Sequence, residues 1–448
     1  MHKQHTGGGI LLLSHVGYSF VEDLASALGA RGLRTFVLSS RPEPAHTGRL
    51  DELRHLADDV TATDAHVLTH RDVEHCLADL HRRGETVLAC VTVWEGYRHL
   101  MSFANEALGV SDLGEKQILA LRDKLTLRNR LFEAGLTRVR AAELTPASLA
   151  AHQALDGRYF VKPVSGIASY GAFPLGPGTT WADIERITAE SRDDTVYASA
   201  FGDDGLTFLV EDYLPGREFS FEVVVTDGAA HVVALHEKCE VTETAGTVLE
   251  NACTSPPVSV TAAERAAGIA WVRRLLTELD LRWGCFHIEA RYEDSHWDLI
   301  EINPRVGGSL ISHSTRELTG GASLLDLWID ALLAEPGDGF RERLAALSYT
   351  ADGRTPTQNA TFFRVFFAEK GRIASVRVSE ELPLPPVVTH LLLKAGDTVD
   401  ATAREVFLGQ LLWRYPRDEA DRLFPELARA SAHAIDIQYE RQDEGGPR

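Results

Sequence analysis

The first hundred residues alternate short apolar runs with helical segments, and this alternation limits the folds open to the chain. Apolar runs lie at 10–13, 34–39 and 86–93. Between them lie a segment at 21–28, with apolar residues at i, i+3, i+4 and i+7, and a second helical segment at 73–83. Strands that are apolar throughout are typical of a parallel sheet with helices on both faces. We therefore expect the chain to begin with an α/β domain.

Length and composition indicate an ordinary globular protein of roughly three domains. The chain has 448 residues, of which 44% are hydrophobic and 25% charged. Its 65 acidic residues outnumber its 45 basic residues, which gives a net charge of −20. This balance argues against a general nucleic-acid or membrane-surface binder, because phosphate-rich surfaces attract Lys and Arg.

Cysteine usage and hydropathy point to a compartment. The five cysteines are scattered and form no CxxC pair, so we expect neither a structural zinc site nor a disulfide scaffold. No apolar stretch approaches the roughly 18 residues that span a bilayer, and the run at 10–13 is too short for a signal peptide. We therefore expect a cytoplasmic protein that binds neither nucleic acid nor membrane.

The most informative segment is 283–305. Two strands meet at the polar turn 293–296, so we expect an antiparallel hairpin in which Glu289 and Glu301 lie opposite one another or one step apart. By the alternation of strands, Glu301 should share its face with Leu299 and Asn303. Two carboxylates side by side repel unless a cation lies between them. Mg²⁺ prefers such oxygen ligands and also binds substrate phosphates.

Arg305 follows one alternation later, where it could bind a phosphoryl group through two hydrogen bonds. The alternative is a surface hairpin whose acidic side chains are merely solvated. The attached sequence Asn303-Pro-Arg-Val-Gly-Gly308 favours the magnesium site over that alternative.

Two lysines and a small-residue loop form a candidate phosphate site. Lys124 lies at the start of a helix, behind Asp123 as its N-cap, and Lys162 lies on a strand among apolar neighbours. The loop 165–171 follows Lys162, and its backbone N–H groups, including that of Ser169, could bind phosphate oxygens. The loop matches neither the GxxxxGK[ST] nor the GxGxxG pattern. For such a loop alone, an ordinary turn between two strands is the more common explanation.

A fourth segment covers 209–222. A strand ends near 212–214, a Pro-Gly turn follows, and Glu218 opens the next strand. Extended backbone here could offer a carbonyl and an N–H to a purine edge, and Glu218 could accept hydrogen bonds from ribose hydroxyls.

These four segments, in this order and spacing, resemble the ATP-grasp superfamily over about residues 10–435. The resemblance rests on Val-Lys-Pro before the small loop, on Val-Glu-Asp-Tyr-Leu-Pro-Gly-Arg-Glu at 210–218, and above all on Glu289 with Glu-Ile-Asn-Pro-Arg at 301–305. The pair Gly307-Gly308, the sequence Ser-Leu-Leu-Asp at 323–326 and the strand-rich tail resemble the branch of L-amino acid ligases and carnosine synthase.

The resemblance implies an α/β fold, α+β overall. An N-terminal Rossmann-like domain with a parallel sheet would cover residues 1–115, and linker helices with a small lid domain would cover 116–214. A large antiparallel-sheet domain would cover 215–448, with a strand-rich subdomain from about 345.

The resemblance also implies a role for each matching residue. The residues implied to bind ATP are Lys124, Lys162, Ser169, Glu211, Asp212, Tyr213, Leu214, Glu218 and Lys238. Within that set, 211–214 would form the adenine hinge and Glu218 would hold the ribose. The ligands implied for Mg²⁺, with Mn²⁺ as a substitute, are Glu289, Glu301 and Asn303. Arg305 and Lys238 would be the catalytic cations, Arg305 stabilising an acyl phosphate and its tetrahedral successor.

The implied reaction joins a small-molecule carboxylate to an amine through an acyl phosphate, giving a dipeptide or similar amide of specialised metabolism. The residues expected near substrate are Glu250, Arg305, Gly308, Ser309 and His313. Glu250 would hold an amino group, and the small residues 307–309 would leave room for a bulky acyl donor. Replacing Ser309 with Trp should then selectively penalise large donors. A homodimer is expected only by analogy with relatives.

Other reactions stay open at this point. Another ATP-grasp reaction could carboxylate a substrate or stop at a phosphorylated product, although the chain has no Met-Lys-Met biotin motif. A nucleotide-binding sensor without catalysis is a third possibility, but a sensor need not keep Arg305.

Overall fold

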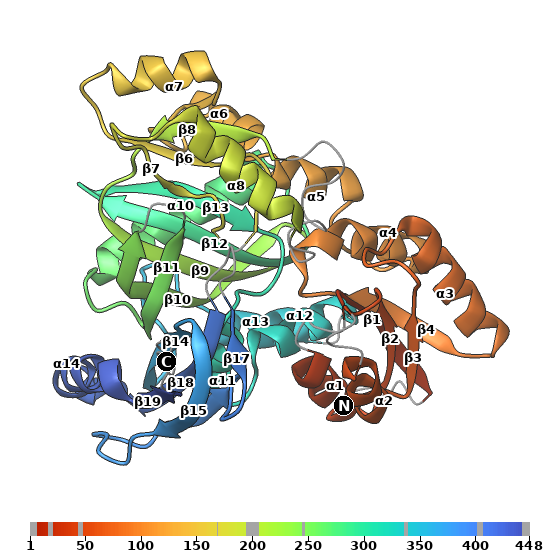
Figure 1. Ribbon diagram of the computed structural model, residues 1–448. Coiled ribbons are helices and arrows are strands. Elements are labelled where there is room, and N and C mark those ends of the chain that lie inside the picture. Colours follow the sequence, from red (N-terminus) through yellow and green to blue (C-terminus); the bar gives the residue numbers. More distant parts are fainter. Residues whose placement is uncertain are drawn as a thin grey trace, which may run out of the picture.

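The computed structural model describes residues 7–16, 21–43, 48–167, 169–193, 206–243, 247–335, 339–400 and 406–440. Figure 1 shows the chain as three neighbouring bodies, with the first sheet to one side, a small sheet above and a large sheet in the centre. The sequence also predicts a small polar turn at 14–19 and a linker around 335–339, and both segments fall partly outside the described residues. Within these ranges, no helix has both the length and the apolar character needed to cross a bilayer.

The first sheet confirms the parallel arrangement expected from the alternating pattern. Its strand order is β3-β2-β1-β4, and all three pairings are parallel. The strands are β1 (Gly8–Ser14), β2 (Arg34–Ser39), β3 (Asp59–Ala62) and β4 (Thr86–Val91). The helices that accompany them are α1 (Val21–Gly29), α2 (Arg49–Leu56), α3 (His70–Arg82) and α4 (Arg98–Leu108), with the short 3-10 helix η2 (Glu95–Tyr97) before α4.

Two linker helices lead to the small sheet, which we call the lid sheet. They are α5 (Glu115–Arg122) and α6 (Lys124–Glu133), and Asp123 caps α6 by accepting from the Thr126 N–H at 3.0 Å, as predicted. The lid sheet has the order β5-β8-β6-β7 and is antiparallel. Its elements are β5 (Ala141–Glu143), α7 (Pro146–Gln153), β6 (Tyr159–Pro163), β7 (Phe173–Pro174), α8 (Trp181–Asp193) and β8 (Phe208–Asp212).

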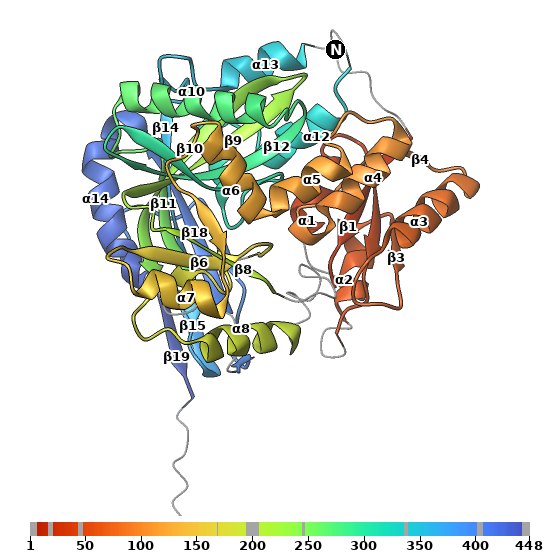
Figure 2. The same cartoon turned by 90° about the horizontal axis from the view of Figure 1, so that it is seen from above.

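The large sheet has eight strands in the order β13-β12-β9-β10-β11-β14-β18-β16, all antiparallel. The strands are β9 (Arg217–Thr226), β10 (Ala229–Glu243), β11 (Val248–Ser255), β12 (Gly284–Glu293), β13 (His296–Asn303), β14 (Asn359–Ala368), β16 (Val388–Leu391) and β18 (Val406–Pro416). Its helices are α10 (Ala262–Glu278), α11 (Ile311–Thr319), α12 (Leu324–Leu332) and α13 (Phe340–Leu347). Figure 2 shows α10 and α13 along the side of this sheet away from the lid.

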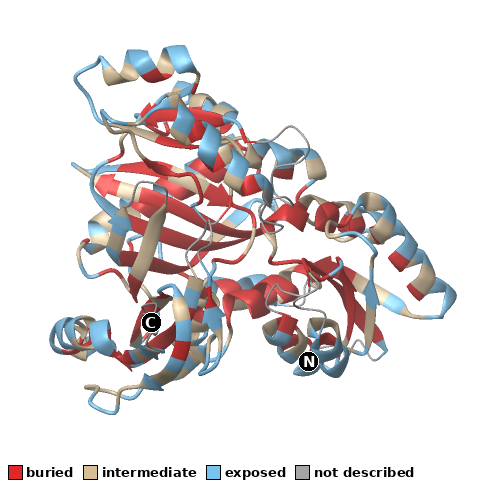
Figure 3. Cartoon of the chain, viewed as in Figure 1, coloured by how far each residue is buried: buried red, intermediate tan, exposed pale blue. Residues whose placement is uncertain are grey.

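The tail adds a three-stranded sheet of order β17-β15-β19 and one helix. These elements are β15 (Gly371–Val378), β17 (Thr398–Val399), α14 (Ala420–Ala430) and β19 (Ile435–Tyr439). Buried residues concentrate on the strands of the first and large sheets (Figure 3). One apolar core joins the first sheet to α12, where Trp328 is fully buried, so the first domain packs firmly on the large one.

The hairpin of β12 and β13 places Glu289 directly opposite Glu301, as the spacing predicted. The prediction that Leu299 shares the face of Glu301 was wrong. A bulge at Ile300 makes Leu299 pair with Ala290, and both lie in the core beneath the sheet. Ile300 and Glu301 therefore both face the cavity described below.

Candidate active site

A cavity of about 820 Å³ lies between the lid sheet and the large sheet and brings the four predicted segments together. The predicted residues that line it are Lys124, Lys162, Ser169, Glu211, Tyr213, Leu214, Glu218, Glu250, Glu289 and Glu301. Asp212 is exposed and lines a separate groove with Arg140 and His152.

Lys162 is the cation of the lid sheet and reaches across to the large sheet. Its Nζ lies 2.6 Å from Glu211 Oε1 and donates to the Ile300 carbonyl at 3.3 Å. Burial lowers the pKa of Lys162 to about 8, although the neighbouring Glu211 carboxylate opposes that shift. The Lys162 ammonium therefore loses its proton more easily than an exposed lysine, and a bound phosphate or similar anion would favour its charged form.

Lys124 reaches the same cavity from the start of α6. Its Nζ lies 3.4 Å from Glu301 Oε2 and donates to the Gly166 carbonyl at 3.2 Å. It therefore connects the small-residue loop of the lid with the hairpin of the large sheet. The two lysines lie where the negative charge of a triphosphate could be neutralised.

Arg128 is a residue that the sequence analysis missed. Its Nε donates to Glu211 Oε2 at 2.8 Å, and its Nη2 donates to the Ile300 carbonyl at 3.0 Å. The side chain is only 2% exposed. Arg128 and Lys162 thus bind the same carboxylate, so the side chain of Glu211 is fully paired and only its backbone remains for a nucleotide.

The predicted hinge at 211–214 is braced by a second missed arginine, Arg291. Its Nη1 donates to the Leu214 carbonyl at 2.6 Å and to Tyr213 Oη at 2.9 Å. Its Nε donates to Glu218 Oε2 at 3.1 Å. Arg291 lies two residues after Glu289 on β12, so the alternation that placed Glu289 could also have found it. The Leu214 carbonyl is therefore already hydrogen-bonded within the protein.

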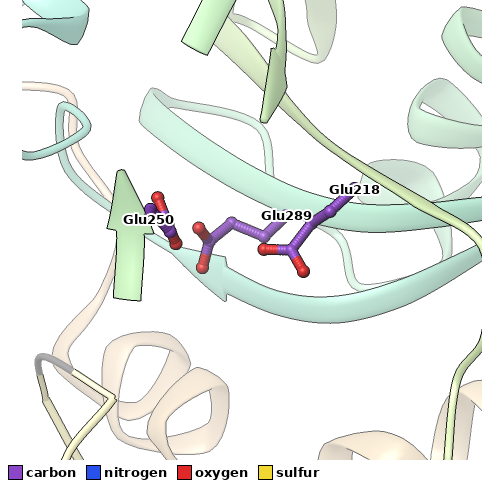
Figure 4. Close-up of side chains that lie close together, drawn as sticks. All are labelled: Glu218, Glu250 and Glu289. Carbon is purple, nitrogen blue, oxygen red and sulfur yellow. The ribbon is translucent and has the colours of Figure 1, made fainter. Parts of the chain in front are cut away.

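Lys238 lies beneath the cavity at the centre of three carboxylates, those of Glu218, Glu250 and Glu289. Its Nζ donates to Glu218 Oε1 at 3.0 Å and also bonds Glu250 and Glu289. Figure 4 shows the three carboxyl groups converging from separate strands. One oxygen of each lies within 4.8 Å of the others, a geometry that could hold a metal ion. In this structure the ammonium group of Lys238, whose side chain is 1% exposed, offsets part of the negative charge of the three carboxylates.

These charges shift one another's pKa values. Burial alone would lower the pKa of Lys238, but Glu250, Glu289 and Glu218 together raise it well above the usual value. Burial raises the pKa of Glu250 to about 7, against the attraction of Lys238. Within this cluster, Glu250 is therefore the carboxyl group whose surroundings favour protonation near neutral pH.

A buried acid on β9, Glu222, supports Glu289 from below. It is fully buried and accepts from His287 Nδ1 at 2.9 Å, while His287 Nε2 lies 3.3 Å from Glu289 Oε1. Burial opposes ionisation of both groups, but their mutual attraction lowers the pKa of Glu222 to about 2 and raises that of His287 to about 10. His287 therefore holds Glu289 in place as a cation. An acid among the apolar residues of 219–225 was a visible signal that the sequence analysis passed over.

Glu289, Glu301 and Asn303 offer only oxygen donors and come from adjacent positions on the hairpin, as a hard divalent cation requires. Asn303 lies opposite His287, and its Nδ2 donates to Glu301 Oε1 at 2.8 Å. Burial and the charge of Glu289 raise the pKa of Glu301, whereas Lys124 lowers it. The charge of Glu289 therefore disfavours ionisation of Glu301, a bound cation would offset that repulsion, and this set of oxygen ligands fits Mg²⁺.

Arg305 does not line the large cavity, and its partner comes from the first domain. Its Nη2 lies 2.9 Å from Glu95 Oε2, and both side chains are largely buried. Glu95 lines a smaller cavity that shares Lys124, Ile300 and Glu301 with the large one. Arg98, three residues on, donates to the Pro304 carbonyl at 2.8 Å. The first domain therefore holds the 303–305 segment at two points, which no local sequence signal predicted.

The remaining predicted substrate residues lie beyond Arg305 and outside the large cavity. Gly308 is exposed, and a Cβ added there would meet nothing within 4 Å. Ser309 Oγ donates to Gln410 Oε1 at 2.7 Å, and its φ of 54° is left-handed. His313 Nε2 lies 3.5 Å from Asp23 Oδ1, on the side of α11 that faces α1. The structure thus places His313 beside the first domain and Ser309 beside β18, and none of the three residues lines the large cavity.

Comparisons with known proteins agree with this arrangement. A profile of the ATP-grasp domain matches residues 158–313. No curated protein sequence matches the chain. The L-amino acid ligase from Bacillus licheniformis is similar in structure, with a TM-score of 0.73 and 16% identity over 97% of this chain and 100% of that one.

Two further solved structures are similar. Phosphoribosylglycinamide synthetase from Anaerococcus prevotii has a TM-score of 0.63 and 15% identity over 97% of this chain and 100% of that one. Biotin carboxylase from Campylobacter jejuni has a TM-score of 0.63 and 12% identity over 96% and 92%. The domain profile identifies residues 158–313 as an ATP-grasp domain, and the fold of the chain as a whole is similar to that of these three solved structures.

Proposed function

We propose that the protein is an ATP-dependent carboxylate–amine ligase. In this reaction a carboxylate oxygen attacks the γ-phosphorus of ATP, so that ADP leaves and an acyl phosphate forms. An amine then attacks the acyl carbonyl, loses a proton and expels phosphate, which leaves an amide. A dipeptide or a similar small amide is the proposed product.

The observation that carries this proposal is the position of Arg305, which binds a carboxylate beside the small cavity. Its guanidinium binds a carboxylate, that of Glu95, beside the small cavity that Lys124 and Glu301 also line. An arginine that accepts a carboxylate next to the phosphate-binding end of a nucleotide cavity suits a carboxylate substrate attacking a γ-phosphate. Arg305 would stabilise the acyl phosphate and the tetrahedral intermediate that follows.

The other site residues have roles that follow from their charge and position. Lys124, Lys162 and the loop around Ser169 would hold the phosphates in line with the attacking oxygen, and most of the rate would come from this positioning. Glu289, Glu301 and Asn303 would hold Mg²⁺ or Mn²⁺, which neutralises phosphate charge when bound. The lid would exclude water, which otherwise hydrolyses an acyl phosphate.

The branch of the superfamily is also part of the proposal. The solved structure with the TM-score of 0.73 is an L-amino acid ligase, and its whole length is covered by this chain. The synthetase and carboxylase structures have TM-scores of 0.63. This difference supports amino-acid-like substrates, with Glu250 as the acid that would hold an amino group and Lys238 as a catalytic cation.

The test measures ADP and phosphate release from purified protein with ATP, Mg²⁺ and amino acids supplied singly and in pairs, with products identified by mass. ADP and phosphate formation that needs both an acid and an amine supports the ligase. ADP formation without phosphate indicates a kinase, and turnover that needs bicarbonate indicates a carboxylase. Nucleotide binding without turnover under all these conditions contradicts an enzyme and favours a sensor.

A further inference from the structure

Arg291 on β12 is a cation of the large cavity that has no part in the proposed reaction. It lines the cavity together with Leu214 and Glu218, and its side chain is only 12% exposed. In the pairing of β12 with β9, Arg291 lies directly opposite Glu218. Opposite charges that face each other across two strands attract, so this pair is part of the sheet itself.

The guanidinium of Arg291 is held by acceptors on several sides. Its Nε donates to Glu218 Oε2 at 3.1 Å, and its Nη2 lies 3.1 Å from the same oxygen. Its Nη1 donates to Tyr213 Oη at 2.9 Å and to the Leu214 carbonyl at 2.6 Å. Its Nη2 donates to Glu243 Oε1 at 3.1 Å. A planar fork of N–H donors that binds four residues has little freedom to turn. Arg291 therefore fixes the carboxylate of Glu218 relative to the backbone at Leu214.

Glu218 binds a different cation through each of its oxygens. Oε2 faces two nitrogens of Arg291, whereas Oε1 accepts from Lys238 Nζ at 3.0 Å. A carboxylate has about four acceptor positions, shared between its two oxygens. Arg291 therefore occupies the Oε2 side of the carboxylate, and the acceptor position left for a ligand is on Oε1.

This arrangement limits how Glu218 could bind a sugar in the cavity. The 2′- and 3′-hydroxyls of a ribose are neighbours, and a carboxylate that binds both offers one oxygen to each. Because Arg291 holds Oε2, Glu218 can offer Oε1 alone, so one hydroxyl would donate to it and the other would not. The Glu218 side chain is 8% exposed, so solvent would do little to replace a hydrogen bond that is lost there.

We propose that Arg291 is a positioning residue for the nucleotide and that it restricts Glu218 to a single hydroxyl of the ribose. The ligand class is a nucleotide of which one sugar hydroxyl is recognised and the other is not. This inference rests on the proposed use of ATP and deepens it, because it names the part of the sugar that the protein recognises. Arg291 acts through Glu218 and has no contact with the reacting atoms.

The test measures binding rather than turnover. The full-length protein with Mg²⁺ is titrated calorimetrically with ADP, 2′-deoxyADP and 3′-deoxyADP. In the wild type, one deoxynucleotide should bind about tenfold or more weakly than ADP, and the other should bind within about threefold of ADP, because a hydrogen bond to a charged group is lost in one case only.

Three variants then assign this selectivity to Arg291. Arg291→Met should bring the Kd values of the two deoxynucleotides to within about threefold of each other, because the Glu218 carboxylate is then free to turn. Arg291→Lys keeps the charge without the planar fork and should reduce the difference in the same direction. Arg282→Met, at an exposed arginine that pairs with Asp227, is the matched control and should leave the difference unchanged.

Equal losses for the two deoxynucleotides in the wild type, or no loss for either, would overturn the inference. A difference that persists in Arg291→Lys while all three affinities fall together would show a structural role for Arg291 and would overturn it as well. If Arg291→Met does not fold, Arg291→Lys decides. Because no turnover is needed, selective binding without amide formation would refute the ligase alone, whereas failure of all three nucleotides to bind would refute the nucleotide site and this inference together.

Discussion

Replacing Lys238 with Met removes the one ammonium that three carboxylates share, and it should destabilise the fold in a pH-dependent way. Glu218 lies 3.0 Å from the Lys238 Nζ, and Glu250 and Glu289 are bonded to it as well. Methionine has a similar length and no charge, so the change leaves the packing nearly intact and exposes the carboxylates to one another. Arg291, which binds Glu218, is then their closest remaining cation.

The magnitude follows from what the carboxylates do instead. An ion pair at 4 Å is worth about 4 kcal/mol at an effective dielectric constant of 20. Without the Lys238 ammonium, a carboxylate of the cluster avoids repulsion from its neighbours by taking up a proton. For a carboxyl group of ordinary pKa, protonation at pH 7 costs about 4 kcal/mol. Glu250, with a pKa of about 7, is half protonated already and adds little. We therefore expect a loss of about 3–5 kcal/mol, the usual effect of breaking a buried ion pair.

The assay is thermal or denaturant unfolding between pH 4 and 8. For 448 residues the unfolding entropy is about 1 kcal/mol per degree, so the melting temperature should fall by about 4 °C at pH 7. A carboxyl whose pKa is raised by folding destabilises the fold above its unfolded pKa; this effect shrinks as the pH falls below the raised pKa and is gone below the unfolded one. The deficit should therefore shrink toward pH 4, and Mg²⁺ should restore more stability to the variant than to the wild type. Lys116→Met, at an exposed lysine, is the control. A variant as stable as the wild type, or a deficit that does not change with pH, would refute this reasoning.

Three further predictions concern catalysis. Because burial lowers the pKa of Lys162 to about 8, kcat/KM for ATP should fall as the pH rises through that value, and Lys162→Arg should move the fall to higher pH; a profile with no alkaline fall in the wild type contradicts this. Arg305→Lys should reduce turnover about 100-fold or more while changing the KM for ATP less than about threefold, and equal effects on both would argue for a structural role. With hydroxylamine as the amine, Gly308→Leu should reduce hydroxamate formation from phenylalanine more than from glycine, because the added side chain would fill open space that the expected bulky acyl donor needs. It is a cleaner probe than Ser309→Trp, because a bulky residue would strain the left-handed backbone at Ser309.

Local periodicity predicted the elements that carry the site. The apolar runs of the first hundred residues gave the parallel sheet, and the spacing between Glu289 and Glu301 gave their pairing across the hairpin. Asp123 was recognisable as an N-cap because a side-chain oxygen before a helix satisfies a free backbone N–H. These features depend on neighbours in sequence, which is why a sequence shows them.

Contacts between distant segments could not be read in the same way. Glu95 binds Arg305 although the two residues lie 210 positions apart, and no pattern in the sequence around either residue indicates the other as its partner. Arg128 meets Glu211 because α6 lies beneath the lid sheet, which only the packed fold determines. The bulge at Ile300 did leave a local signal that the sequence analysis passed over, because two consecutive apolar residues, Leu299 and Ile300, interrupt the alternation of the strand.

That bulge has a consequence for experiments on the site. The carbonyl of Ile300 accepts hydrogen bonds from both Lys162 and Arg128, so a peptide group rather than a side chain ties the lid lysine to the strand that carries Glu301. Alanine substitutions along the strand would leave these backbone hydrogen bonds in place and would report only on the side chains. Deleting Ile300 would keep Glu301 opposite Glu289 but would remove this backbone acceptor. A deletion therefore tests the role of the Ile300 carbonyl, which side-chain substitutions do not change.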